Sequence, residues 1–285
     1  MVAPGLVVVD KAPGMTSHDV VARVRRLAGT RKVGHAGTLD PMATGVLVLG
    51  VDRATRLLGH LMLTEKAYDA TIRLGAVTTT DDAEGEVVST HTVDGVREDD
   101  VRTELARFVG AIEQVPTAVS AIKVDGQRAY ARVRAGEQVE LAARPVTIHE
   151  LVVHEVALPE VRLSVRCSSG TYIRAIARDL GAALGVGGHL TALRRTAVGS
   201  FDLSVARTLE ELAEDFAVLP IAEAARASFP VLDLAVEQAA DVRFGRALDV
   251  ALPGSGPHAV FAPDGEFLAL YEQRGEQARA VAVFV

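Results

Sequence analysis

The chain is short of the residues that indicate disulfides, a membrane span or a metal centre. Its 285 residues include one cysteine, Cys167, so no internal disulfide can form, and such usage is typical of a reducing compartment. No apolar run approaches the roughly 20 residues that span a bilayer, and the first ten residues lack the basic lead and cleavage site of a signal peptide. The eight histidines show no Cys or His pairing at zinc-ligand spacing. We therefore expect a cytoplasmic protein without a membrane segment or a metal.

Net positive charge is also lacking, because the chain sums to −7, and this argues against a nucleic-acid partner. The charge is unevenly spread, however. Residues 1–66 and 162–195 balance at +4 and +5, whereas residues 81–113 and 200–241 each balance at −7. A basic face can attract a polyanion despite an acidic total. The alternative is that the arginines are scattered over solvated faces, and both interpretations stay open.

Aromatic side chains make up only 4% of the chain, and tryptophan is absent. Four aromatics precede residue 200, namely Tyr68, Phe108, Tyr130 and Tyr172. The three tyrosines fall at expected turns, strand ends or helix starts, where a flipped nucleic-acid base could stack. For Tyr68 the alternative is ordinary core packing, because it begins the apolar face of an expected strand.

One Gly-rich loop, Gly34 to Gly45, contains a single acid, Asp40, and leads into an apolar run at 46–51 that indicates a buried strand. Because Asp40 precedes Pro41, its backbone is pushed toward an extended conformation. A loop held against a core strand can aim one side chain at a cleft. The simpler interpretation is a turn whose acid caps local amides, and spacing alone favours it.

The residues S-S-G-T-Y-I-R at 168–174 predict a helix with Thr171 as its N-cap, running to about Leu184. Arg174 then lies in the first turn, where a cation opposes the helix dipole by up to about 1 kcal/mol. An arginine in that position needs an anionic partner. A catalytic carboxylate is one candidate, and a surface ion pair with Asp179 is the other.

Apolar periodicity predicts the remaining elements. Strands are expected at 5–10, 67–74, 147–156, 161–167 and 189–198, and helices from 16 or 17 to about 28, at 98–109 and, as a short acidic pair, within 208–227. The acid-dense stretch 78–86 indicates a solvated turn rather than a metal cluster, because no second ligand group accompanies it. Residues 114–145 gather basic side chains around Tyr130 and indicate either an insertion that clamps a partner or a surface hairpin. Residues 229–285 indicate a small β-rich domain.

Taken together, these segments resemble the bacterial TruB-type tRNA pseudouridine synthases nearly from end to end. The resemblance rests on six segments in the family's order: Asp10-Lys11 with Gly14-Met15-Thr16-Ser17, Gly34 to Pro41 with Ala43-Thr44-Gly45, Tyr68, Ser120-Ala121-Ile122-Lys123, Gly170 to Arg174, and Leu193-Arg194-Arg195. Two departures are Ala12 and Thr117, where the family usually has proline. They affect the turn before the first helix and the pose of the segment around 115–145, and neither removes a reactive group.

The resemblance implies an α+β fold, with a central mixed or antiparallel sheet flanked by helices in residues 1–228. It also implies an RNA-gripping insertion around 115–145 and a PUA-like RNA-binding domain at 229–285. The implied activity is isomerisation of the uridine at position 55 in the T loop of tRNA, through base flipping. No cofactor or metal is implied, and we expect a monomer that binds the T stem-loop.

Site residues follow from the same resemblance. Asp40 would be the essential carboxylate and would attack either the sugar or the base. Arg174 would pair with Asp40, and Tyr68 would stack on the target base and serve in proton transfer at the sugar. The pocket would be lined by Tyr172 and Leu193.

Two further residues have supporting roles in the resemblance, since His35 would contact the T loop and Lys11 would support the Asp40 loop or a phosphate. Two other classes of function remain to be weighed. A non-catalytic RNA-binding protein or tRNA chaperone has no need for Asp40, Tyr68 and Arg174 together. A nucleoside or glycoside hydrolase would need a second acid or a water-activating base, and no motif supplies one.

Overall fold

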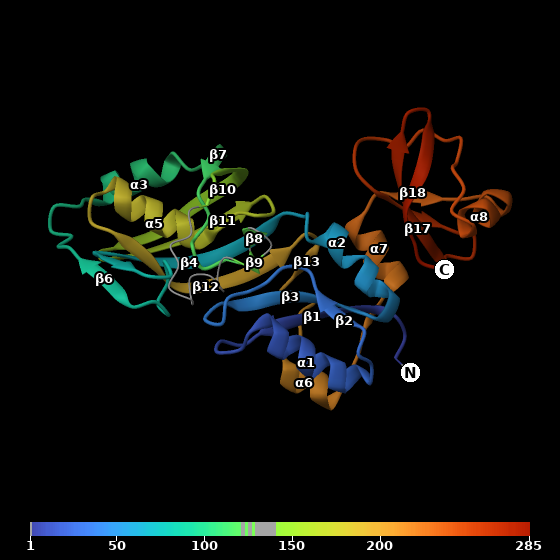
Figure 1. Ribbon diagram of the computed structural model, residues 1–285, viewed down its shortest axis with the longest axis horizontal. Coiled ribbons are helices and arrows are strands. Elements are labelled where there is room, and N and C mark those ends of the chain that lie inside the picture. Colours follow the sequence, from blue (N-terminus) through green and yellow to red (C-terminus); the bar gives the residue numbers. More distant parts are fainter. Residues whose placement is uncertain (1, 121–122, 125–126, 129–140) are drawn as a thin grey trace.

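The computed structural model describes residues 2–120, 123–124, 127–128 and 141–285 (Figure 1). Ten strands form its central sheet: β1 (Gly5–Lys11), β2 (Val33–His35), β3 (Thr44–Val51), β4 (Lys66–Leu74), β7 (Gly110–Gln114), β10 (Arg144–Ala157), β11 (Glu160–Cys167), β12 (Gly188–Val198), β13 (Phe201–Asp202) and β14 (Leu219–Pro220). The main strand order is β14-β1-β3-β12-β4-β11-β10-β7. Every neighbouring pair in it is antiparallel except β12 with β3, so the expected mixed sheet is confirmed.

Helices flank this sheet in two groups. They are α1 (Ser17–Ala28), the 3₁₀ helix η1 (Asp52–Arg56), α2 (Leu58–Leu61), α3 (Glu98–Ala106), α5 (Ile173–Ala183), α6 (Leu209–Glu214) and α7 (Ile221–Ser228). Figure 1 shows α3 and α5 beside the half of the sheet that contains β4, β10 and β11, and α1 with α6 beside the half that contains β1 and β3. Two short hairpins, β5 (Ala76–Thr78) with β6 (Val87–Thr90) and β8 (Lys123–Val124) with β9 (Gln127–Arg128), complete this larger part.

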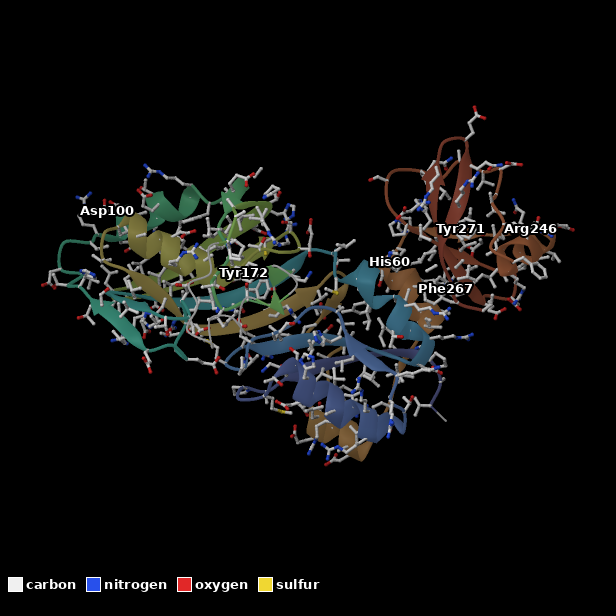
Figure 2. The ribbon with its side chains drawn as sticks, viewed as in Figure 1. His60, Asp100, Tyr172, Arg246, Phe267 and Tyr271 are labelled. Atoms are coloured by element: carbon white, nitrogen blue, oxygen red, sulfur yellow. The ribbon has the colours of Figure 1, made fainter. Side chains whose placement is uncertain are left out.

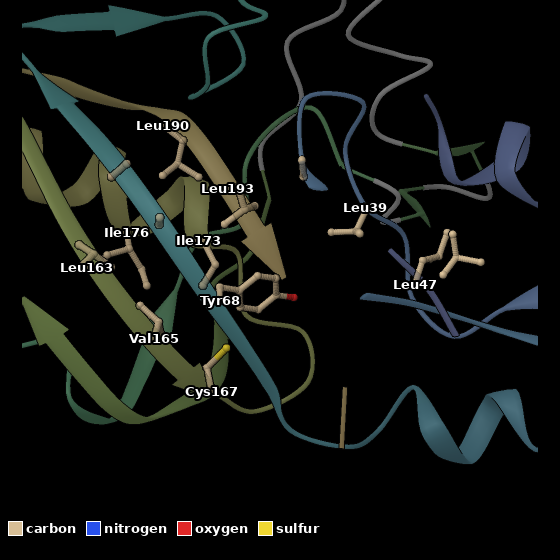
Figure 3. Packing of buried hydrophobic residues seen from close by; sticks show 14 of the residues in the cluster. Leu39, Leu47, Tyr68, Leu163, Val165, Cys167, Ile173, Ile176, Leu190 and Leu193 are labelled. Carbon is tan, nitrogen blue, oxygen red and sulfur yellow. The ribbon is translucent and has the colours of Figure 1, made fainter. Parts of the chain in front are cut away.

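The expected alternation along β4 is present. Tyr68, Ala70, Ile72 and Leu74 are all buried on one face, where they join a cluster with Ile173 and Ile176 of α5 (Figure 3). Burying such side chains stabilises the fold by about 1.5–3 kcal/mol each. This packing fixes α5, and therefore its N-terminal end, against the middle of the sheet.

The two halves of the sheet meet at a narrow junction. β3 and β12 pair in parallel through only two residue pairs, Arg194 with Thr44 and Arg195 with Gly45. Gly45 has φ +96°, and a Cβ atom there would collide with the carbonyl oxygen of Arg195. Glycine is therefore required at this crossing. The space where the two strands diverge becomes a cavity.

Helix starts were predicted with mixed success. The sequence left Thr16 and Ser17 as candidates for the cap of α1, and the structure has Thr16, in a capping box with Asp19. The predicted cap of α5 is wrong, because Tyr172 is the N-cap residue and the Thr171 hydroxyl donates to Ser168 O instead. The amide of Gln114, at the end of β7, instead holds the backbone of this N-cap residue: its Oε1 accepts from Tyr172 N at 2.8 Å, and its Nε2 donates to Tyr172 O at 3.1 Å.

A C-terminal β domain follows α7. It has a four-stranded sheet of β15 (Val231–Asp233), β16 (His258–Phe261), β17 (Phe267–Arg274) and β18 (Gln277–Val283), with α8 (Val236–Arg243) beside it. Phe261, Phe267 and Phe284 pack in one cluster with residues of β1, β3 and α7. The ring of His60, a residue of α2 labelled in Figure 2, packs edge-on against that of Phe229, where this domain begins, with centroids 6.3 Å apart. The domain is thus held against the larger part by a shared apolar core.

The remaining predictions concern a membrane span, the basic insertion and the domain boundary. In the part of the chain that the structure describes, no helix is long and apolar enough to cross a membrane. The basic insertion predicted around 115–145, with Tyr130 at its centre, lies mostly outside the described residues. The division of the chain at residue 228 stays a prediction.

Candidate active site

A cavity of about 290 Å³ opens at the junction of β3 and β12. Its volume is at the lower end of small-molecule pockets, which measure about 300–1,000 Å³. The lining residues come from the Asp40 loop, β4, β12, the start of α5 and the segment after β7: Gly37, Thr38, Leu39, Asp40, Met62, Lys66, Tyr68, Ser120, Ser169, Gly170, Thr171, Tyr172, Ile173, Arg174, Leu193 and Arg195. Asp40 is the one carboxylate among the described lining residues.

The Asp40 loop is clamped on both sides of the acid by the last residue of β1 and the first residue of α1. Ser17 Oγ accepts a hydrogen bond from Leu39 N at 2.8 Å and donates one to Leu39 O at 3.1 Å. Lys11 Nζ, which is fully buried, donates to Pro41 O at 3.1 Å as well as to two carbonyls of its own turn. The two residues that flank Asp40 are therefore fixed by side chains far away in the sequence.

A second clamp comes from β12. The Arg195 side chain is buried and donates to Val46 O at 2.7 Å, to Gly37 O at 3.2 Å and to Thr38 O at 3.3 Å. It joins the beginning of β3 to the glycine-rich part of the loop. Together with Ser17 and Lys11, it holds Asp40 at a defined point in the cavity wall.

Asp40 and Arg174 form a two-point ion pair. Arg174 Nε lies 3.0 Å from Asp40 Oδ2, and Arg174 Nη2 lies 3.2 Å from Asp40 Oδ1. Such a fork fixes the plane of a carboxylate as well as its charge. The ion pair expected from the sequence is present, and the alternative pairing of Arg174 with Asp179 is not, since Asp179 pairs with Arg178.

The Arg174 guanidinium is fixed from its other side. Nη1 donates to Thr80 O and Nη2 to Val119 O, each at 2.8 Å, and Asp82 Oδ2 lies 3.5 Å from Nη1. Asp82 has only 4% of its side chain exposed. The prediction that residues 78–86 form a solvated turn is therefore wrong for Asp82, because the turn folds back so that this acid neutralises a buried arginine.

Opposing electrostatic effects act on the pKa of Asp40. One third of its side chain remains accessible through the mouth of the cavity. Burial raises the pKa of Asp40 above its ordinary value, and Asp82 adds to that rise, whereas Arg174 and Lys11 oppose it. A two-point pair with guanidinium is the arrangement of an ionised carboxylate.

Tyr68 projects from β4 across the cavity, with its hydroxyl toward the loop that carries Leu39 (Figure 3). Burial raises the pKa of Tyr68, while Arg195 opposes that rise, so the phenol keeps its proton at neutral pH. Burial likewise raises the pKa of Tyr172, which lies in the middle of the larger part (Figure 2). Leu193 adds an apolar wall.

Positive charge surrounds the single acid of the cavity. Lys66 donates from Nζ to Met62 O at 2.9 Å and to Thr64 O at 2.8 Å. Burial, followed by the nearby Arg195, lowers the pKa of Lys66 to about 8. With Arg174 and Arg195, this lysine gives the cavity a cationic wall that suits an anionic ligand.

The structure brings five of the seven predicted site residues into the cavity wall, namely Asp40, Tyr68, Tyr172, Arg174 and Leu193. Lys11 lies behind the loop as a support. His35, on β2, is not among the lining residues, and its ring packs edge-on against that of His18 with centroids 5.7 Å apart. In the described residues no group of three or more His, Cys, Asp or Glu side chains is arranged to hold a metal.

The chain is similar over nearly its whole length to known proteins. Residues 25–173 match the family described as "TruB family pseudouridylate synthase (N terminal domain)", and residues 174–228 and 229–285 match two C-terminal domains of tRNA pseudouridine synthases. A tRNA pseudouridine synthase B of Arthrobacter sp. (strain FB24) is 58% identical, with 98% of this chain and 96% of that protein covered. The tRNA pseudouridine synthase B of Thermobifida fusca (strain YX) is also 58% identical, and the match covers 99% of this chain and 99% of that protein.

The chain is also similar in fold to proteins of solved structures. The chain matches a protein in the "Crystal Structure of a Cbf5-Nop10-Gar1 Complex" with a TM-score of 0.77 and 26% identity, and the match covers 99% of this chain and 85% of that one. A chain in the "Structure of H/ACA RNP bound to a substrate RNA containing 2'-deoxyuridine" matches with a TM-score of 0.75 and 25% identity, over the same shares of both chains.

Proposed function

Because the chain belongs to the TruB family of pseudouridylate synthases, we propose that Asp40 is the group through which it converts uridine 55 in the T loop of tRNA to pseudouridine. The chain is a tRNA pseudouridine synthase, an isomerase. The observation that supports the role of Asp40 is its position as the one acid among the described residues of a cationic cavity, held in plane by Arg174.

The isomerisation exchanges one bond for another without consuming water. The bond between C1′ of the ribose and N1 of the uracil breaks, the base turns, and C1′ joins C5. N1 gains a proton and the hydrogen of C5 leaves. One carboxylate that attacks the nucleotide is sufficient for this chemistry, whereas hydrolysis would need a second group to activate water.

The other lining residues supply the environment for Asp40. The ring of Tyr68 offers a stacking surface, and its protonated hydroxyl is available for proton transfer at the sugar. Tyr172 and Leu193 close the cavity against water, which would divert the cleaved base into a hydrolysis product. Lys66 and Arg195 favour the phosphates beside the target nucleotide.

The catalytic function is favoured over a non-catalytic RNA-binding module. A group of two carboxylates around a buried arginine costs desolvation free energy, so a binding module has no reason to keep it. We further propose that the protein acts in the cytoplasm as a monomer on the T stem-loop. Residues 1–228 would be the catalytic domain, residues around 115–145 would grip the RNA, and residues 229–285 would be a PUA-like RNA-binding domain.

Tritium release tests this function. A T-arm RNA transcript labelled with tritium at C5 of uridine should lose one tritium per molecule, and digestion should yield pseudouridine. A transcript with cytidine at the target position should release none. Free uracil among the products would instead favour a hydrolase, and binding without release would favour a binding module.

A further inference from the structure

One hydroxyl in the wall of the cavity lacks a close hydrogen-bond partner among the described residues. Ser120 is 5% exposed and lines the cavity, yet its Oγ has no partner at ordinary hydrogen-bond geometry among the described residues. Two other hydroxyls of the same wall are used, since Ser169 donates to Met62 O and Thr171 donates to Ser168 O. Buried polar atoms in native proteins almost always have a partner, so a bound ligand is expected to supply this one.

The position of this hydroxyl is fixed relative to the reactive acid. Val119, its chain neighbour, accepts a hydrogen bond from Arg174 Nη2 at 2.8 Å, and the same nitrogen lies 3.2 Å from Asp40 Oδ1. Ser120 N in turn donates to Ala118 O at 3.1 Å. A ligand that reaches Asp40 therefore meets the Ser120 hydroxyl in a set geometry.

The chemistry of the surroundings selects the part of the ligand that Ser120 would meet. Ser120 and Tyr172 line the same cavity, and a weak hydrogen-bond interaction between their hydroxyls lowers the pKa of Tyr172 against the larger effect of burial. The serine therefore lies at the ring-binding end of the cavity. The edge of a uracil ring has two carbonyl oxygens, O2 and O4, on either side of N3–H. A hydroxyl can turn its hydrogen toward either acceptor.

We propose that Ser120 Oγ donates a hydrogen bond to a carbonyl oxygen of the target uracil, and that it does so both before and after the ring turns. This inference rests on the proposed function. Rotation of the ring by half a turn about its N3–C6 axis exchanges N1 with C5, as the reaction requires, and it also exchanges C2=O with C4=O. A donor beside the ring then finds a carbonyl in the same place in substrate and product, so it stabilises both orientations without moving.

The test compares wild type with Ser120→Ala on three T-arm RNAs that carry uridine, 2-thiouridine or 4-thiouridine at the target position. Sulfur is a weaker acceptor than oxygen, and pseudouridine formation is followed by nucleoside chromatography. Ser120→Ala should lower kcat/KM on uridine by about 3- to 10-fold, the range of one neutral hydrogen bond. Wild type should be slowed by at least one of the thio substitutions, and that penalty should shrink at least about threefold in Ser120→Ala.

A matched control is Thr117→Val, which removes a buried hydroxyl of the same segment that bonds Val119 O at 3.3 Å and does not line the cavity. Any effect of Thr117→Val should be equal on all three RNAs. The proposal is overturned if Ser120→Ala keeps the wild-type kcat/KM on uridine, or keeps the full thio penalties. Failure of the proposed function would be distinct, because wild type would then form no pseudouridine.

Discussion

Replacing Arg174 with lysine separates charge from geometry at the centre of the site. The guanidinium bonds both oxygens of Asp40, the carbonyls of Thr80 and Val119, and lies beside Asp82. An ammonium keeps the positive charge but has no planar fork. The variant therefore tests whether catalysis needs Asp40 to be held in plane or only to be neutralised.

The magnitude follows from the contacts that lysine cannot reproduce. At least two charge-assisted hydrogen bonds are lost, at about 1.5–3 kcal/mol each. If this loss falls on the transition state, the single-turnover rate constant drops by at least about 100-fold, since each 1.36 kcal/mol is tenfold. The midpoint of thermal unfolding should also fall, because Asp82 keeps a weaker partner.

The assay is single-turnover tritium release at saturating enzyme, beside a filter-binding measurement of Kd for the same RNA. The matched control is Arg178→Lys, one turn along α5. Arg178 likewise pairs with acids, Asp81 and Asp179, and bonds the carbonyl of Val115, but it does not line the cavity. The Arg178→Lys variant should have a lower unfolding midpoint but a single-turnover rate close to that of wild type. Turnover of Arg174→Lys within tenfold of wild type would refute the reasoning.

Two further predictions concern the acid behind Arg174 and the lone thiol. Asp82→Asn should slow turnover by about tenfold. It should also move the acid limb of the pH–rate profile to lower pH, because the charge of Asp82 raises the pKa of Asp40. An unmoved acid limb in the kcat profile would contradict the electrostatic coupling between Asp82 and Asp40. Burial raises the pKa of the Cys167 thiol to about 11, so it should react at pH 8 with a disulfide reagent more than about 100-fold slower in the native protein than in denaturant. The unfolded chain loses this proton first, near its ordinary value of 9.0, so chemical denaturation should show stability falling between pH 9 and 11 in wild type, and less so in Cys167→Ala. A native thiol that reacts at the denatured rate would contradict this burial.

Local patterns predicted most of the elements in this chain. The alternation along 67–74 gave β4 and its buried face, and the Thr16 cap gave the start of α1. The poor electrostatic position of Arg174 in its helix correctly indicated an anionic partner. These features depend on residues close together in sequence, where periodicity and capping rules apply.

Long-range contacts could not be predicted in the same way. Asp82 stands in an acid-rich stretch that has the composition of a solvated turn, and only the folded chain brings it to Arg174. The start of α5 is held by Gln114, which bonds Tyr172 from 58 positions away in the sequence. The side chains of Ser17 and Arg195 hold the Asp40 loop through backbone carbonyls, which no residue pattern reveals.

Asp40→Asn is the most direct test of the central claim, because asparagine keeps the size of the side chain and removes the attacking carboxylate. Product formation should fall below detection in single-turnover tritium release, while Kd for the T-arm RNA and the unfolding midpoint stay close to wild type. If this variant still forms pseudouridine at a rate near that of wild type, Asp40 is not the catalytic group.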